Sequence, residues 1–91
     1  MKYDTVSRSD FILMCSKMND SLEGAVTLHI FKRFVIGAII DHCFYNGVAF
    51  IYDRTVYTVE NTDRSGYLYD VLYNTKAGTI NEWITAVSTM I

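Results

Sequence analysis

Two helix-start patterns, one near each end of the chain, most constrain how this sequence can fold. Residues 7–10 and 79–82 both fit the capping box, in which Ser7 or Thr79 at the N-cap is followed three residues later by an acidic side chain. An apolar stripe at helical spacing follows each box. The stripes are Phe11, Met14, Cys15 and Met18 after the first box, and Ile80, Trp83, Ile84, Val87 and Ile91 after the second. We therefore predict a helix near each end of the chain, the first stopping near residues 19–20.

The segment that follows position 40 favours β-structure. Asn46-Gly47 is the strongest short hairpin signal, and it would pair residues 41–45 with residues 48–52. The next apolar run, residues 55–60, is separated from that strand by Asp53-Arg54, where the side-chain alternation changes phase. A phase change of this kind indicates a tight turn or a bulge. We therefore predict three consecutive strands in this segment.

Two further segments complete the predicted sheet. Residues 67–73 follow a polar loop over residues 61–66 and have the composition and length of a strand. Residues 24–40 are rich in β-branched and aromatic side chains, which favours two strands broken near Lys32-Arg33. The alternative is a single helix over residues 24–40, which would contain Gly37 and be apolar on nearly every side. Such a helix must be buried all round, and a chain of 91 residues supplies too little cover.

The order of a helix, several consecutive strands and a second helix is typical of an α+β protein. We expect one small globular domain over residues 1–91, built as an antiparallel β-meander of four to five strands. The N-terminal and C-terminal helices would pack on one face of that sheet. Apolar residues make up 51% of the chain and charged residues 20%, which is typical of a globular protein. The formal net charge of −2 speaks against a nucleic-acid partner, which requires a basic face.

Targeting features and cysteine usage suggest a cellular location. The longest strongly apolar run without a charge, residues 34–40, is far shorter than the roughly 20 residues that a membrane span needs. The first residues also lack the continuous apolar segment of a signal peptide. We therefore expect a cytoplasmic protein that does not enter a membrane, located in the host cytoplasm if a phage encodes it. Cys15 and Cys43 would be free thiols in that reducing compartment.

The groups that could carry chemistry are poorly spaced for catalysis or metal binding. Cys15, His29, His42 and Cys43 are residue types that bind zinc, but they contain no CxxC or HxxxH pair. Asp41, His42 and Cys43 are the residue types of a thiol catalyst, but neighbours on a strand point to opposite faces, so His42 would face away from the other two. The five glycines are scattered and form no phosphate-binding loop. We expect no catalytic residues, no metal and no cofactor, and hence a protein that is not an enzyme.

Tyrosine is the one residue type in marked excess, with seven in 91 residues. On a strand, Tyr67, Tyr69 and Tyr73 would share one face. Tyr57 and Tyr52 would extend this aromatic surface on neighbouring strands. Tyrosine combines a large apolar ring with a polar tip, which explains its enrichment at interfaces. Three interpretations stay open: the surface binds a protein partner or a second copy of the chain, it stacks nucleotide bases, or the tyrosines pack beneath the helices.

In size, lack of proline and absence of a specific motif, the chain resembles the small α+β proteins that phages and mobile elements use against host defences, anti-CRISPR proteins among them. The resemblance is one of general style and assigns no role to any residue. It implies a binding protein that inhibits by occupying its partner's working surface. The candidate partner-binding residues are Tyr67, Tyr69, Tyr73, Tyr57, Tyr52 and Arg64.

Two other functions remain as alternatives. In the first, the chain is a module that sequesters a nucleotide or signal molecule by aromatic stacking, in which Arg64, Arg54 or Arg33 would contact phosphate. It would otherwise be a structural subunit of an oligomer. Bound nucleotide would raise the absorbance of the purified protein at 260 nm and shift its melting temperature, whereas a protein inhibitor needs its partner.

Overall fold

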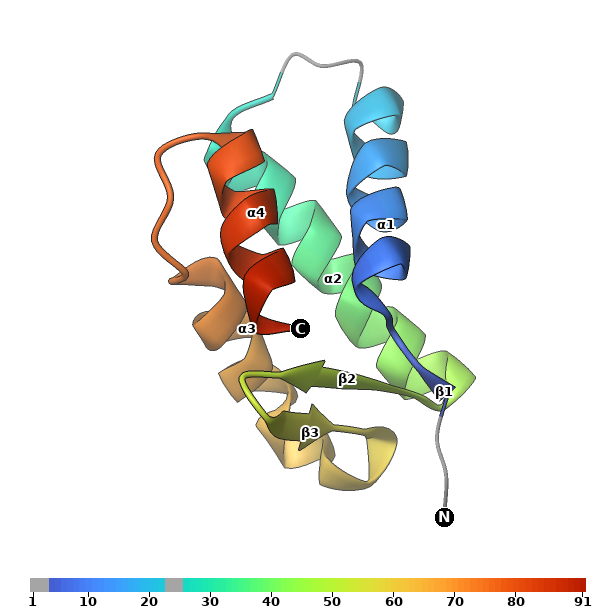
Figure 1. The fold of residues 1–91 in the computed structure, drawn as a ribbon. Coiled ribbons are helices and arrows are strands. Elements are labelled where there is room, and N and C mark those ends of the chain that lie inside the picture. The colour runs from blue at the N-terminus through green and yellow to red at the C-terminus, as the bar shows by residue number, and fades with distance from the viewer. Residues whose placement is uncertain (1–3, 23–25) are drawn as a thin grey trace.

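A computed structural model describes residues 4–22 and 26–91, with the side chains of residues 62–65 outside the description. Within these residues, four α-helices pack together and a small sheet lies at one end of them (Figure 1). Helices α1 and α4 lie in front of α2 in this view. In chain order the elements are β1 (Asp4–Thr5), α1 (Arg8–Ser21), α2 (Leu28–Asn46), β2 (Val48–Tyr52), β3 (Thr55–Tyr57), the 3-10 helix η1 (Val59–Arg64), α3 (Ser65–Tyr73) and α4 (Ile80–Met90).

The two helices predicted near the chain ends are confirmed, together with their caps. In α1, the backbone N–H of Asp10 donates to the Ser7 hydroxyl, and the backbone N–H of Ser7 donates to the Asp10 carboxylate, both at 3.0 Å. In α4, the backbone N–H of Glu82 donates to the Thr79 hydroxyl at 3.1 Å. These bonds satisfy amide groups that have no partner within the helix, and so fix where each helix begins.

The two strands predicted over residues 24–40 are wrong, because from Leu28 onward this region forms the long helix α2. The helix begins at Thr27, whose hydroxyl accepts a hydrogen bond from the backbone N–H of Ile30 at 3.2 Å. Its buried residues recur at helical spacing: Phe31, Val35, Ile36, Ile39 and Cys43. Burial along one side of the helix therefore outweighs the strand preference of the individual residues. Residues 24 and 25 lie outside the described part of the chain.

Two other segments predicted as strands, residues 41–45 and 67–73, are also helical. Asn46 ends α2, and Gly47 is its C-cap with a φ of 63°, so the expected hairpin turn is instead the end of a helix. Both structures need a residue with positive φ after Asn46, which glycine supplies without strain. The expected strand over residues 67–73 is helix α3, whose buried residues Leu68 and Leu72 are four positions apart.

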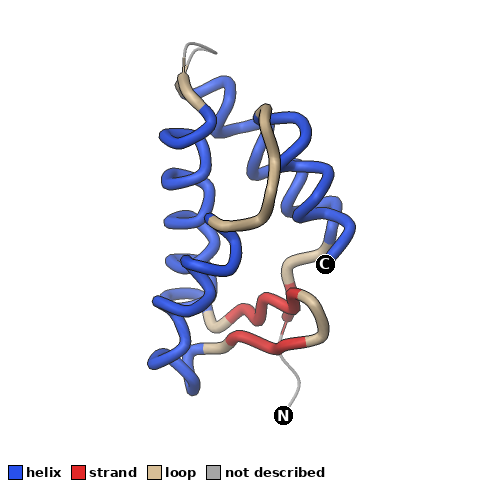
Figure 2. Tube along the Cα trace, turned by 90° about the vertical axis from the view of Figure 1, so that its left-hand side faces the viewer, coloured by secondary structure: helices blue, strands red, loops and turns tan. Residues whose placement is uncertain are grey.

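The predicted meander of four to five antiparallel strands is therefore wrong; the described residues contain a mixed sheet of three short strands in the order β1-β2-β3. Strand β1 runs parallel to β2, with Asp4 opposite Val48. Strands β2 and β3 are antiparallel and joined by the predicted tight turn at Asp53-Arg54, with Tyr52 opposite Thr55. The tube view shows that this sheet covers only one end of the helices (Figure 2). The helices therefore pack mainly against one another rather than on one face of a sheet.

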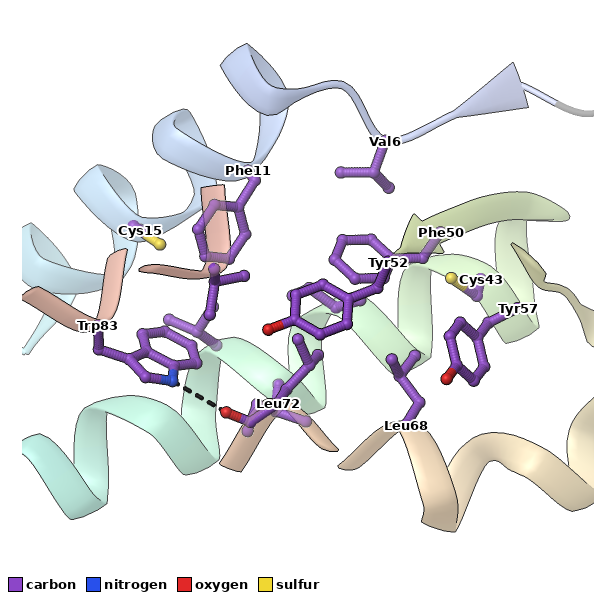
Figure 3. Close-up of a cluster of buried hydrophobic side chains, with 14 of the residues drawn as sticks. Val6, Phe11, Cys15, Cys43, Phe50, Tyr52, Tyr57, Leu68, Leu72 and Trp83 are labelled. Carbon is purple, nitrogen blue, oxygen red and sulfur yellow. Dashed lines mark hydrogen bonds between the residues drawn. The ribbon is translucent and has the colours of Figure 1, made fainter. Parts of the chain in front are cut away.

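The core is a continuous cluster of side chains that come from all four helices and from the sheet (Figure 3). Trp83 of α4 is fully buried in this cluster, as predicted, but helices rather than strands surround it. Its ring contacts Phe11 of α1 and Phe31 of α2 edge-on, with centroids 5.9 and 6.1 Å away. Its indole N–H donates to the carbonyl of Leu72 in α3 at 2.9 Å. Trp83 thus ties the three other helices to α4.

Candidate functional site

Tyr52 and Tyr57, two of the predicted binding residues, are buried and belong to the core. Figure 3 shows their rings among the other core side chains. The hydroxyl of Tyr52 shares a hydrogen bond of 2.7 Å with the hydroxyl of Thr75. These two tyrosines therefore have a structural role in the core and do not form part of an exposed aromatic surface.

The three tyrosines of α3 do not share one face, contrary to the prediction for a strand. Tyr69 and Tyr73 are four residues apart on the helix, and their rings stack with centroids 6.0 Å apart and an interplanar angle of 11°. Tyr67 lies on another side of α3, is 59% exposed, and has its ring 6.4 Å from that of Tyr57. The change from strand to helix thus divides the predicted surface in two.

Tyr73 is held against the first turns of α2. Lys32 donates from its ammonium group to the Tyr73 carbonyl at 2.9 Å and lies 4.9 Å from the centre of the Tyr73 ring. His29 contacts the same ring edge-on and hydrogen-bonds the Tyr73 hydroxyl. A cation that binds the last carbonyls of a helix also balances the negative end of its dipole. These contacts fix the end of α3 on α2 and set the position of Tyr69.

A groove of about 430 Å³ lies between α2 and α3, lined by Ile30, Arg33, Phe34 and Tyr69. Ile30 and Phe34 are 38% and 51% exposed, so both present large apolar surfaces to solvent. Among the described residues, no carboxylate forms an ion pair with Arg33. The groove therefore combines two apolar side chains, an aromatic ring with a polar tip and an unpaired cation, which is the composition of many binding surfaces.

The apolar surface continues along α2 beyond the groove. Phe44 and Tyr45, near the end of the helix, are 47% and 77% exposed. With about 3.6 residues per turn, they lie on the same side of α2 as Ile30 and Phe34. This side faces away from the residues that α2 buries against α1 and α4, which lie in front of it in Figure 1. We call it the outer face of α2; its members are Ile30, Arg33, Phe34, Gly37, Asp41, Phe44 and Tyr45.

The outer face was not expected from the sequence, because residues 24–40 were predicted as strands. A helix was disfavoured here because 91 residues supply too little cover for one that is apolar on nearly every side. The helix α2 forms nevertheless, and one side of it stays exposed. The spacing of Ile30, Phe34 and Phe44 would have located the outer face had the helix been assumed.

The two cysteines are buried and free. Burial raises the pKa of the Cys15 thiol to about 12 and that of the Cys43 thiol to about 11. Thiols with such pKa values are almost entirely protonated at neutral pH, and a protonated thiol is a poor nucleophile and metal ligand. Asp41 and His42 are exposed on other sides of α2, so the helix separates these three neighbouring side chains. In the described part of the chain, no three His, Cys, Asp or Glu side chains gather as a metal site would require.

Arg33, one of the three arginines considered for phosphate contacts, lines the groove beside α3. Arg54 lies in the β2–β3 turn and is exposed, and the side chain of Arg64 lies outside the described residues. Among the described helices, none is long and apolar enough to cross a membrane.

Comparison of the chain with protein-family models, with curated proteins and with solved structures finds no match in any of the three.

Proposed function

We propose that this chain is a non-enzymatic protein-binding module that works through the outer face of α2 and the flanking Tyr69. The observation that carries the proposal is the exposure of large apolar side chains along one helix: Ile30, Phe34, Phe44 and Tyr45. Single exposed apolar residues are common on protein surfaces, whereas an aligned set on one element is typical of interaction sites. The module would act by covering its partner's working surface, as an inhibitor does.

The composition of the face suits a protein rather than a small ligand. Aromatic residues and arginine are enriched in the centres of protein interfaces. The outer face offers Phe34, Phe44 and Tyr45 together with Arg33, and it extends over most of the helix instead of closing into a pocket. A cytoplasmic location belongs to this proposal, because free thiols such as Cys15 and Cys43 are favoured in a reducing compartment.

The test is affinity capture from the native source with wild type and two matched variants. Phe34→Asp places a charge on the outer face, where Phe34 is 51% exposed. Leu13→Asp places the same charge on α1, at a side chain that is 53% exposed. Because both side chains are exposed, both variants should melt within a few degrees of wild type. We expect Phe34→Asp to lose the captured protein and Leu13→Asp to retain it. Equal capture by both variants would overturn the proposal.

A nucleotide ligand is the second candidate, and the position of Arg33 favours it. Arg33 lines the same groove as Phe34 and Tyr69, so a base stacked on one of these rings would bring its phosphate near a guanidinium group. Purified protein that carries a nucleotide shows excess absorbance at 260 nm, and added nucleotide raises the melting temperature. Arg33→Gln should abolish this shift, with Arg54→Gln, an arginine outside the groove, as the control. A melting temperature that no nucleotide changes would exclude this candidate.

A further inference from the structure

We propose that the occupant of the outer face of α2 is a second copy of this chain, with the two α2 helices antiparallel and their two-fold axis passing next to Gly37. This inference rests on the proposed function, since it names the partner of the same surface. It follows from three features of α2: the positions of its exposed apolar residues, the positions of its two exposed charges, and the glycine between them.

The outer face is self-complementary about Gly37. When two identical helices pair antiparallel with Gly37 opposite Gly37, each residue lies opposite the one at the same distance on the other side of Gly37. Ile30 then lies opposite Phe44 of the second copy, and Phe44 opposite Ile30. Both side chains are exposed in the single chain, at 38% and 47%. The arrangement therefore brings apolar surfaces together at both ends of the contact.

The same alignment pairs opposite charges. Arg33 lies four residues before Gly37 and Asp41 four residues after it, so each arginine faces the aspartate of the other copy. Within one chain the two side chains are eight residues apart, or about 12 Å along the helix axis, too far to pair. A parallel arrangement would place arginine opposite arginine and aspartate opposite aspartate, which like-charge repulsion disfavours. The charges therefore select the antiparallel arrangement.

Gly37 supplies the space for close approach. Glycine within a helix costs about 1 kcal/mol relative to alanine. Nothing among the described residues explains this cost, because a Cβ atom built at Gly37 would meet none of their atoms within 4 Å. At the centre of a helix pair, by contrast, the absence of a side chain lets two backbones approach each other. The Ile30–Phe44 and Arg33–Asp41 pairs point to the same contact between two copies, independently of the glycine.

The size of the face sets the expected strength of the dimer. Helix α2 has 19 residues. At a rise of 1.5 Å per residue and a width of about 10 Å, its outer face has a footprint on the order of 300 Å² per copy. Stable complexes bury about 800 Å² per partner, so this contact belongs with the weak, reversible interfaces. We expect a dissociation constant between about 10 and about 500 μM.

Sedimentation equilibrium of the full chain, from about 1 μM to about 1 mM, measures this dimer directly. We expect wild type to shift from monomer to dimer over that range. Arg33→Glu sets like charges opposite each other at two symmetric places and should weaken the dimer about tenfold or more. The double variant Arg33→Glu with Asp41→Arg restores the opposite charges and should recover the dimer. The control Lys76→Glu makes the same charge change at an exposed position in the α3–α4 loop and should leave the dimer unchanged.

Gly37→Gln provides an independent test that does not rely on charge. The new side chain points into open space in the single chain and improves helix propensity, so the monomer should melt at the same temperature or higher. The dimer should be lost, because the glutamine side chains hold the two helices apart. A dimer that persists in Gly37→Gln, or that Arg33→Glu leaves intact, overturns the inference.

A chain that stays monomeric up to about 1 mM also overturns the inference, but it leaves the proposed function standing. In that case the affinity capture with Phe34→Asp and Leu13→Asp still tests whether the outer face binds a different protein. If instead the dimer forms and depends on Gly37 and Arg33, while no other protein is captured, the protein-binding face is confirmed with the second copy as its partner.

Discussion

At the scale of single residues, the β2–β3 turn holds Asp53 and Arg54 in a backbone conformation that suits aspartate but not arginine. Asp53 and Arg54 have φ values of 47° and 67°, in the left-handed region. This is the turn type that best joins two short antiparallel strands, and it favours Asn or Asp followed by Gly. The aspartate fits this preference, whereas the arginine carries a Cβ atom at a position that suits glycine.

Replacement of Arg54 by glycine should therefore stabilise the protein. Relief of the left-handed strain outweighs the greater freedom of glycine in the unfolded chain, for a net gain of about 0.5–1 kcal/mol. The melting temperature should rise by several degrees, as measured by circular dichroism.

Replacement of Gly47 by alanine is the reverse experiment, because it puts a side chain at a residue with a φ of 63°. The added Cβ would meet no atom of the described residues within 4 Å. It should lower stability by about 1 kcal/mol, through backbone strain alone. A lower melting temperature for Arg54→Gly would contradict the argument.

The capping box at the start of α1 makes the stability of the protein depend on pH. The backbone N–H of Ser7 and then its hydroxyl hold the pKa of Asp10 below its usual value of 3.8. A carboxyl group whose pKa is lower in the folded state contributes stability above its unfolded pKa and loses that contribution as the pH falls through its folded pKa. Between about pH 6 and about pH 3, the melting temperature of Asp10→Asn should therefore fall less than that of wild type. Equal falls would show that Asp10 contributes nothing to acid unfolding.

At the scale of whole elements, Trp83 is the side chain on which the packing of the helices depends most. It is fully buried, it contacts Phe11 and Phe31 edge-on, and its indole N–H donates to the carbonyl of Leu72. Trp83→Ala should lower the free energy of unfolding by about 3–5 kcal/mol, the usual range for truncation of a large core residue. Trp83→Phe keeps most of the ring packing but loses the hydrogen bond, and should cost about 1–2 kcal/mol.

Urea unfolding followed by circular dichroism measures both changes. Tryptophan fluorescence of the wild type provides the check on the starting state, since a buried indole emits at shorter wavelength than an exposed one. An emission maximum typical of exposed tryptophan in the native protein would contradict this account of α4.

Predictability from sequence also differs between elements. The starts of α1 and α4 could be predicted, because Ser7 and Thr79 act through bonds to residues three positions away. Helix α2 could not be predicted from residue preferences, because its β-branched and aromatic residues favour strands until tertiary packing buries one side of them. Gly47 shows the same ambiguity in a single residue: it was predicted in a hairpin turn and is instead the C-cap of α2, because a glycine of positive φ suits both settings.

For the molecule as a whole, the missing information was which elements lie next to one another. Tyr52 and Tyr57 were placed on a binding surface because the sequence does not show that both are buried. The ring of Tyr57 contacts that of Tyr67 in α3, and the hydroxyl of Tyr52 bonds that of Thr75 just beyond that helix. The candidate site shows the same limit. Arg33, Phe34 and Tyr69 come together because α3 packs on α2, where Lys32 and His29 hold the end of α3.

The two ends of the described fold are joined by one side chain, Arg8. Its guanidinium group donates to the carbonyl of Ser88 at 2.8 Å and to that of Ile91 at 3.4 Å, so the first turn of α1 holds the last turn of α4. The β2–β3 turn reaches the same place, because the backbone N–H of Asp53 donates to the carbonyl of Met90 at 2.9 Å. The end of α4 is thus held by two segments that are distant from it in the sequence.

Replacement of Arg8 by alanine sets two effects of opposite sign against each other. Loss of hydrogen bonds to a charged donor costs about 1.5–3 kcal/mol. Removal of a positive charge from the N-terminal turn of α1 contributes about 0.3–1 kcal/mol of stability through the helix dipole. The net effect should be a loss of about 1 kcal/mol, measured by urea unfolding against the control Lys17→Ala on the exposed side of α1. Hydrogen exchange should rise at the backbone N–H groups of Ile91 and Asp53 and stay unchanged at Phe31 within α2. If Arg8→Ala proved as stable as wild type, with unchanged exchange at Ile91 and Asp53, the hydrogen bonds from Arg8 would contribute nothing to holding the end of α4.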